Sequence, residues 1–134
     1  MAVESGLGLD VRVDDHSGDV QNLSNDIQSC DFGTPRGVQD VTGLDKSAKE
    51  TILLLADFTI TLTGTFNDAT DRSHAVFKTV PSASVVRTVR IELSSQNISN
   101  EVNFTDYSFS RGADGSMIWT APGVLATGVV PTWS

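Results

Sequence analysis

The chain has a single cysteine, Cys30, and only two histidines, His16 and His74, among its 134 residues. One cysteine excludes an intrachain disulfide framework and is typical of a protein made in a reducing cytoplasm. So few nitrogen and sulfur ligands argue against a zinc or iron site, and the acidic residues are too dispersed for a dedicated calcium loop. We therefore expect no metal and no cofactor.

Long hydrophobic runs and basic clusters are also missing. The first residues, MAVESGLGLDVRV, lack the basic start and apolar core of a signal peptide, and no segment is long enough to cross a bilayer, so we expect no membrane association. Nine basic residues stand against 17 acidic ones, for a net charge of −8. This balance argues against tight binding of nucleic acid, which needs clustered Lys and Arg. It is still compatible with nucleic acid as a passing cargo.

A catalytic constellation is not evident in the sequence. Asp71, His74 and one of the serines would make a triad on paper, but no spacing supports it and no nucleophile elbow is present. His74 is better explained as part of the first turn of a helix. We expect a protein that is not an enzyme.

What the chain does have is a strong β pattern in TILLLADFTITLTGTFN, residues 51–67. Phe58, Ile60, Leu62 and Phe66 fall on one side of this stretch, which predicts a strand with one face in a core. The other side carries four uncharged threonines, which suit a subunit contact or a smooth wall, although a face in open water is compatible with them too. Residues 52–55 are apolar on both sides, so we expect the strand to begin buried on both faces.

The rest of the pattern predicts a mainly β fold, a β-sandwich or barrel with one short flanking α-helix, in a single domain over residues 1–134. We expect the helix at 73–79, capped by Asp71 or Ser73 and stopped by Pro81, and a possible helical turn at 45–50. Asp114-Gly115 predicts a tight hairpin turn. Residues 14–42 are interpreted as a long hairpin of two irregular strands, with a floppy loop as the alternative. Residues 124–134 form an extended C-terminal arm that ends near Trp133.

Three segments in order, DVTGLDKSAKETILLLADFTITLTGTFN, SHAVFKTV and FTDYSFSRGADGSMIWTAPGVLATGVVPTW, resemble the major tail tube protein of long, non-contractile-tailed bacteriophages. The resemblance covers about Asp14 to Trp133. It implies that six subunits close a ring around a β-lined lumen and that rings stack into a tube, locked by a long hairpin and the terminal arms. It further implies a virion protein made in the host bacterial cytoplasm. Its partners would be copies of itself, a tape-measure protein, and tail-tip and tail-terminator proteins, with DNA as passing cargo that is not specifically bound.

Carried over by position, the resemblance places the stacking hairpin within 14–42, the helix at 73–79 and the arm at 124–134, while strands 56–66 and 85–93 supply sheet edges or lumen wall. Trp133 would pack on a neighbour or close its own barrel. Arginines, Arg87 among them, would pair across interfaces to relieve the repulsion between acidic subunits. The candidate inter-ring and inter-subunit contact residues are Phe32, Pro35, Arg36, Val38, Val41, Thr59, Thr61, Thr63, Thr65 and Trp133.

Two alternatives remain open from the sequence. The first is the inner tube of a contractile or secretion-type injection system, whose cargo is a protein. The second is a monomeric β-sandwich that binds a ligand such as a carbohydrate. A carbohydrate module usually presents a planar aromatic platform, and Tyr107, Trp119 and Trp133 are too scattered along the chain to predict one.

Overall fold

The computed structural model describes residues 5–134, so residues 1–4 of the predicted domain lie outside the described part. It is mainly β with one short helix, as predicted. The elements in chain order are β1 (Asp10–Asp14), β2 (Val20–Asn22), β3 (Ile27–Gly33), β4 (Arg36–Asp40), β5 (Thr51–Ala56), β6 (Thr59–Thr65), α1 (Ser73–Phe77), β7 (Arg87–Leu93), β8 (Gln96–Phe104), β9 (Ser108–Arg111) and β10 (Met117–Leu125).

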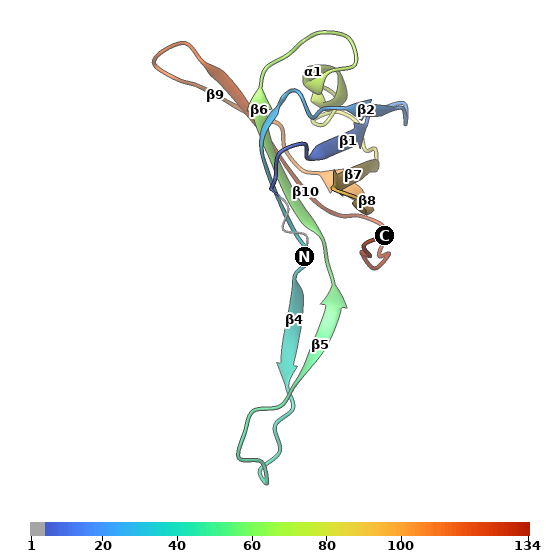
Figure 1. Ribbon diagram of the computed structural model, residues 1–134, viewed down its shortest axis with the longest axis vertical. Coiled ribbons are helices and arrows are strands. Elements are labelled where there is room, and N and C mark those ends of the chain that lie inside the picture. Colours follow the sequence, from blue (N-terminus) through green and yellow to red (C-terminus); the bar gives the residue numbers. More distant parts are fainter. Residues whose placement is uncertain (1–4) are drawn as a thin grey trace.

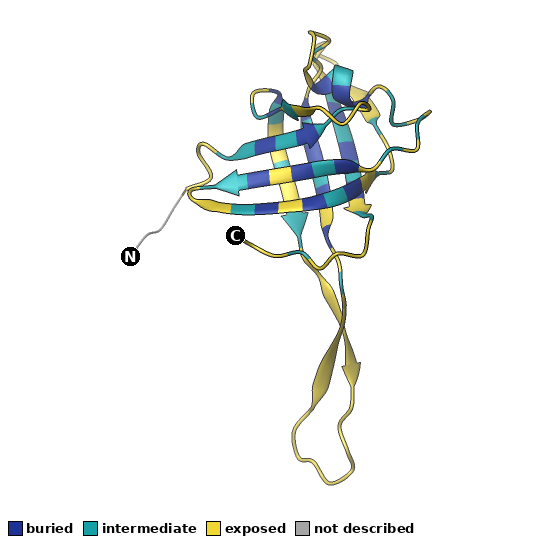
Figure 2. Cartoon of the chain, turned by 90° about the vertical axis from the view of Figure 1, so that its right-hand side faces the viewer, coloured by how far each residue is buried: buried dark blue, intermediate teal, exposed yellow. Residues whose placement is uncertain are grey.

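Eight strands form one antiparallel sheet in the order β2-β1-β7-β8-β10-β6-β3, with β9 beside the first half of β10. The sheet bends on itself, so that β1, β7 and β8 cross in front of β10, β6 and β3 (Figure 2). The core lies between these two halves. Its buried apolar residues are Val11, Val13, Leu23, Phe58, Ile60, Leu62, Val76, Phe77, Val89, Ile91, Ile98, Val102, Trp119 and Ala121.

The bend occurs where β8 meets β10, and a glycine makes it possible. These two strands pair only over Val102–Phe104 of β8 and Gly123–Leu125 of β10. The earlier part of β10, residues 117–120, pairs with β9 instead. A Cβ atom on Gly123 would lie 2.5 Å from Val102 Cγ1 and 3.2 Å from Ile60 Cγ2, distances that leave no room for a side chain. The close approach of the two sheet halves therefore requires glycine at this position.

Strand β6 confirms part of the predicted alternation. Phe58, Ile60 and Leu62 are all buried, as expected. Gly64 takes the next inward position because the Asp26 carbonyl and the Trp119 ring occupy the space that a Cβ atom would need. Phe66, which the alternation also placed on the core side, lies past the end of β6 and is exposed, so that part of the prediction is wrong.

Helix α1 covers one end of the sandwich with Val76 and Phe77, and the Phe77 ring centre lies 5.2 Å from that of Trp119. Neither Asp71 nor Ser73 caps it, since the N-cap residue is Arg72, whose side chain makes no capping hydrogen bond. The first helical amide, Ser73 N–H, instead donates to the carboxylate of Asp26 at 3.0 Å. The cap comes from a residue 47 positions earlier, which no local pattern reveals.

Residues 14–42 do not form a hairpin, and this prediction is corrected. Strand β2 pairs with β1, β3 pairs with β6 and β4 pairs with β5, so the strands β2, β3 and β4 do not pair with one another. The reason is that Leu23 is buried in the core and Phe32 packs against it, which ties the first two strands of this stretch to the sandwich. The projecting hairpin therefore spans 36–56 (Figure 1), and residues 45–50 form turns and coil with no helix.

Candidate assembly surfaces

The β4–β5 hairpin projects from one end of the sandwich (Figures 1 and 2). Four consecutive apolar residues of β5, 52–55, are exposed on it. The expectation that 52–55 are buried on both faces is wrong: Leu53 is 60% exposed and Leu55 is 90% exposed, and Ile52 and Leu54 are exposed as well. Val38 and Val41 add to the same surface from β4 and the residue after it. A contiguous apolar patch of this kind on a soluble chain marks an interaction site.

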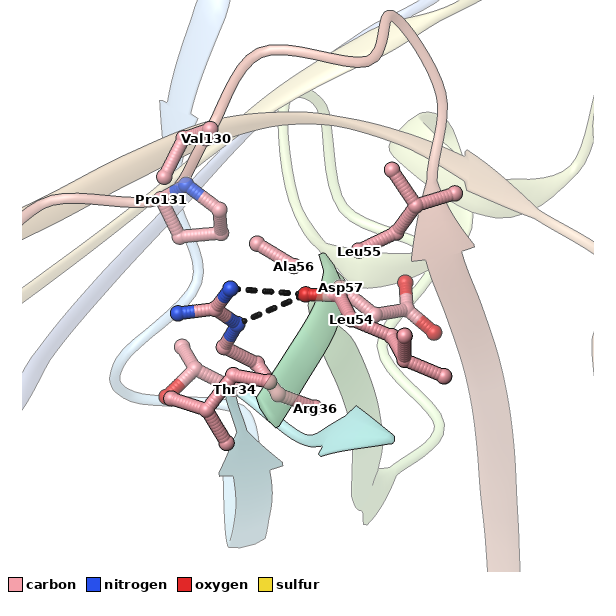
Figure 3. A pocket seen from close by; sticks show the side chains of 9 residues that line it. Thr34, Arg36, Leu54, Leu55, Ala56, Asp57, Val130 and Pro131 are labelled. Atoms are coloured by element: carbon pink, nitrogen blue, oxygen red, sulfur yellow. Dashed lines mark hydrogen bonds between the residues drawn. The ribbon is translucent and has the colours of Figure 1, made fainter. Parts of the chain in front are cut away.

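At the base of the hairpin, Arg36 links β4 to β5. Its guanidinium donates to the Leu54 carbonyl from Nε at 3.0 Å and from Nη2 at 2.7 Å (Figure 3). An open pocket of about 920 Å³ lies here, with Leu53, Leu54, Leu55, Val130 and Pro131 among its apolar lining. Pro35 is exposed at the link between β3 and β4, so the whole base is accessible in a single chain.

The C-terminal arm folds back on its own domain. Ser134 and Asn97 exchange two backbone hydrogen bonds of 2.8 Å, and Trp133 forms an antiparallel bridge with Ile98. The Trp133 ring centre lies 6.1 Å from that of Phe32. Trp133 thus contacts its own domain but stays 49% exposed, and Phe32 has partners within its own chain.

A face without basic residues lies on the outside of β3, β6 and β10. Thr59 and Thr65 are exposed there, and Thr61 and Thr63 are half-buried. The residues paired with the four threonines on the neighbouring strands are Ile118, Thr120, Pro122 and Val124 on β10 and Ser29, Asp31 and Gly33 on β3. Asp31 is the one charged residue in this paired set. We call the outer surface formed by these residues of β3, β6 and β10 the threonine face.

The outside of β1 and β7 is different because it carries charges of both signs. Arg12 pairs with Asp10 at 3.2 Å, and Arg90 pairs with Glu92 at 3.1 Å. These exposed pairs each contribute about 0–1 kcal/mol at most. The two outer faces of the sandwich thus differ in charge. The strands that the resemblance assigned to sheet edges or lumen wall, 56–66 and 85–93, do not share one surface.

Arg87 is not an interface residue, which corrects one expectation. It is buried, and it donates to the Asp14 carbonyl at 3.1 Å and to Thr79 Oγ1 at 2.8 Å. Burial lowers the pKa of its guanidinium, and the nearby carboxylates of Asp15 and Asp14 act in the opposite direction. Arg87 thereby joins the end of β1 to the segment after α1.

The structure does not assemble the catalytic set that we considered on paper. His74 Nδ1 lies 3.3 Å from Tyr107 Oη, and the imidazole lies 4.9 Å from the Phe66 ring at an angle of 55°, so His74 belongs to an aromatic cluster. Within residues 5–134, no group of three or more His, Cys, Asp or Glu is placed to hold a metal ion. No helix in the same part of the chain is long and apolar enough to span a membrane.

Sequence reasoning missed the hairpin leucines as functional candidates. The available signal was a run that is apolar on both sides of a strand and directly follows a charged turn, residues 45–50. A strand with two apolar faces is either buried between two layers of its own chain or exposed in the subunit and covered by another molecule. Local sequence does not distinguish these two cases.

No protein-family model matches this chain, and no curated protein matches it. Solved structures do match. A chain in the virion of a native gene transfer agent particle is similar with a TM-score of 0.79 at 13% identity, covering 97% of this chain and 99% of that one. A chain in the tail of an empty gene transfer agent particle, determined with C6 symmetry, is similar with a TM-score of 0.79 at 15% identity, covering 98% and 99%. Over nearly its whole length, this chain has the fold of a protein found in the tail of a gene transfer agent particle.

Proposed function

We propose that the chain is a structural virion protein that assembles into stacked rings and forms the tail tube of a bacteriophage or phage-like particle, the conduit for DNA. The observation that carries this proposal is the near-complete overlap in fold with a chain from a C6-symmetric tail. The unpartnered apolar hairpin supports it independently, because a chain that displays leucines on both faces of a projecting ribbon needs a partner to cover them. A ring of six subunits follows the symmetry of that tail.

The threonine face is assigned to the wall of the lumen. DNA carries about one negative charge per 1.7 Å of its axis, and every phosphate bound by a basic residue adds affinity that would hold the duplex. A wall of hydroxyl and small apolar groups with one carboxylate, Asp31, holds no phosphate and lets DNA slide. Strand β3 ends the sheet on one side, so its outer edge is available to continue the wall into the next subunit.

The hairpin then links successive rings, because it projects along the long axis of the molecule and away from the sandwich (Figure 1). Val38, Val41 and the β5 leucines would be covered by the next ring. In the virion, the tube would surround a tape-measure protein and lie between tail-tip and terminator proteins. It needs no cofactor and no catalysis.

Electron microscopy of the purified protein at high concentration, with sedimentation velocity alongside, tests the assembly. Stacked rings or hollow tubes support the proposal. A chain that stays monomeric at all concentrations, and also when a preformed tail tip is added, would favour the monomeric binding module. A tube that forms but comes from a genome with a neighbouring sheath gene would favour the contractile injection system.

Labelling of introduced cysteines tests the lumen assignment. In a Cys30→Ala background, Thr63→Cys in assembled tubes should react with a small biotin maleimide but should not capture streptavidin, which is too large to enter the lumen. Ser99→Cys, on the outside of β8, is the matched control and should do both. A Thr63→Cys tube that captures streptavidin places this face outside, and one that resists the small reagent places it in a subunit contact.

A further inference from the structure

The hairpin is one half of a contact, and its other half should be present on the same chain. A contact between different surfaces of identical copies repeats without limit, and the two surfaces lie at opposite ends of the subunit in a head-to-tail stack. The hairpin occupies one end of the long axis, whereas α1 and β9 lie at the other end (Figure 1). The complementary surface should therefore lie near α1 and β9.

An exposed aromatic patch lies at that end. Phe66, Phe109 and Met117 are each between 41% and 46% exposed, and the Phe66 and Phe109 rings meet edge to face at 5.9 Å. Tyr107 supports Phe109 from below with a ring distance of 4.6 Å, and His74 supports Phe66 at 4.9 Å. The patch is thus held rigidly by neighbouring rings, and its upper surface has no cover within the described residues. Rigid aromatic groups of this kind are good anchors for a partner's aliphatic side chains.

Individual charges at the two ends are of opposite sign. The hairpin loop, residues 41–50, contains Lys46 and Lys49, two of the three lysines in the chain, beside Asp45 and Glu50, so its net charge is zero. The hollow beside α1 at the opposite end is lined by three carboxylates and a single lysine, together with two histidines; the lining residues that bear these groups are Asp15, His16, Asp68, Asp71, His74 and Lys78. Asp68 and Asp71 belong to the loop that begins at Phe66, so they adjoin the aromatic patch.

We propose that the patch formed by Phe66, Phe109 and Met117, with the adjoining Asp68 and Asp71, receives the β4–β5 hairpin of a second copy of this chain. The aliphatic side chains of β5 cover the aromatic rings, and Lys46 and Lys49 lie against the carboxylates. The assignment rests on the proposed function and adds to it the surface on which each ring seats the hairpin of the next. It also gives the stack a direction, since only one end of the subunit carries each half of the contact.

A charge-swap series tests the electrostatic half of the contact. Lys46→Glu with Lys49→Glu, and separately Asp68→Lys, should each raise the critical concentration for tube assembly about fivefold at low salt, the upper range for exposed pairs. Combining all three substitutions in one chain should restore most of the loss. Asp68 suits this purpose because no hydrogen bond to its side chain is recorded, whereas Asp71 has a positive φ of 62° and would add strain as lysine. Glu92→Lys makes the same charge change on the outside of β7, where the surface pair with Arg90 contributes little, and is expected to leave the critical concentration unchanged.

The aromatic half is tested by Phe109→Ser, with Val20→Ser on β2 as a control at a similarly exposed position away from the patch. Phe109→Ser should raise the critical concentration more than tenfold, while circular dichroism of the unassembled chain stays unchanged. If wild-type tubes form and neither Phe109→Ser nor the charge swap alters their assembly, this receptor surface is wrong but the tube proposal stands. If the wild type forms no tubes even with a tail tip, the proposed function itself fails.

Discussion

A substitution at Leu55 best separates an effect on assembly from an effect on folding. Its side chain is 90% exposed in the single chain, so replacing it by serine removes almost no burial from the folded subunit. The free energy of unfolding should change by less than about 0.5 kcal/mol, as is usual for a surface substitution. If a neighbouring copy covers this side chain in the tube, the same substitution removes nearly the full burial of a leucine from each contact.

The size of the assembly defect follows from that difference. Complete burial of a leucine side chain contributes about 1.5–3 kcal/mol, and nine-tenths of this is roughly 1.5–2.5 kcal/mol per contact. Since 1.4 kcal/mol corresponds to a factor of ten, the critical concentration of Leu55→Ser should rise about 10- to 60-fold. Pelleting of tubes over a range of protein concentrations measures this value, and urea unfolding of the unassembled chain measures stability.

Leu7→Ser is the matched control because Leu7 is also 90% exposed but lies outside the hairpin. It should change neither stability nor critical concentration. The reasoning is refuted if Leu55→Ser assembles at the wild-type concentration, or if it lowers the free energy of unfolding by more than about 1 kcal/mol, because the hairpin would then be stabilised within its own chain.

Three further predictions concern the subunit itself. Arg87→Ala should lower the free energy of unfolding by about 2–4 kcal/mol, because its half-buried partners, Thr79 among them, lose a charged donor. Arg87→Lys should recover only part of this loss in urea unfolding, since one ammonium group cannot replace the guanidinium fork. Asp26→Ala should cost about 1–3 kcal/mol by leaving the Ser73 amide without its acceptor, and amide exchange at α1 should quicken before exchange in the β strands does. Burial raises the pKa of the Cys30 thiol to about 11 from an ordinary value of 9.0, so the unfolded chain loses this proton first as pH rises. The free energy of unfolding should therefore fall between pH 9 and 11. Denaturant unfolding at pH 8 and 10.5 should show a smaller fall for Cys30→Ala than for the wild type.

Local pattern was sufficient for the fold class and for several elements. The alternation in β6 follows from the two-residue period of a strand, and Asp114-Gly115 supplies the hairpin turn between β9 and β10, where Gly115 has a positive φ of 92°. The short apolar side before Pro81 located α1. Each of these features depends on neighbours within a few residues, which the sequence displays directly.

The pairing of strands was beyond local pattern. Strands β3 and β4 follow one another closely, yet β3 enters the sandwich and β4 leaves it. Phe32 of β3 packs against the core, whereas the one apolar side chain of β4, Val38, is exposed. The cap of α1 likewise comes from Asp26, far away in the chain. The projecting hairpin was accordingly predicted at 14–42 and found at 36–56.

The sequence by itself determined that this chain is a mainly β domain with one short helix, a row of four uncharged threonines and no evident catalytic set, because these properties depend on residue type and short-range spacing. Only the tertiary structure decided that the leucines of β5 face solvent and that Trp133 lies against Phe32 and Ile98 of its own chain. The same apolar side chain serves a core or an interface equally well. Which of the two it serves is decided by whether the rest of the chain reaches it, and the β4–β5 hairpin extends beyond that reach.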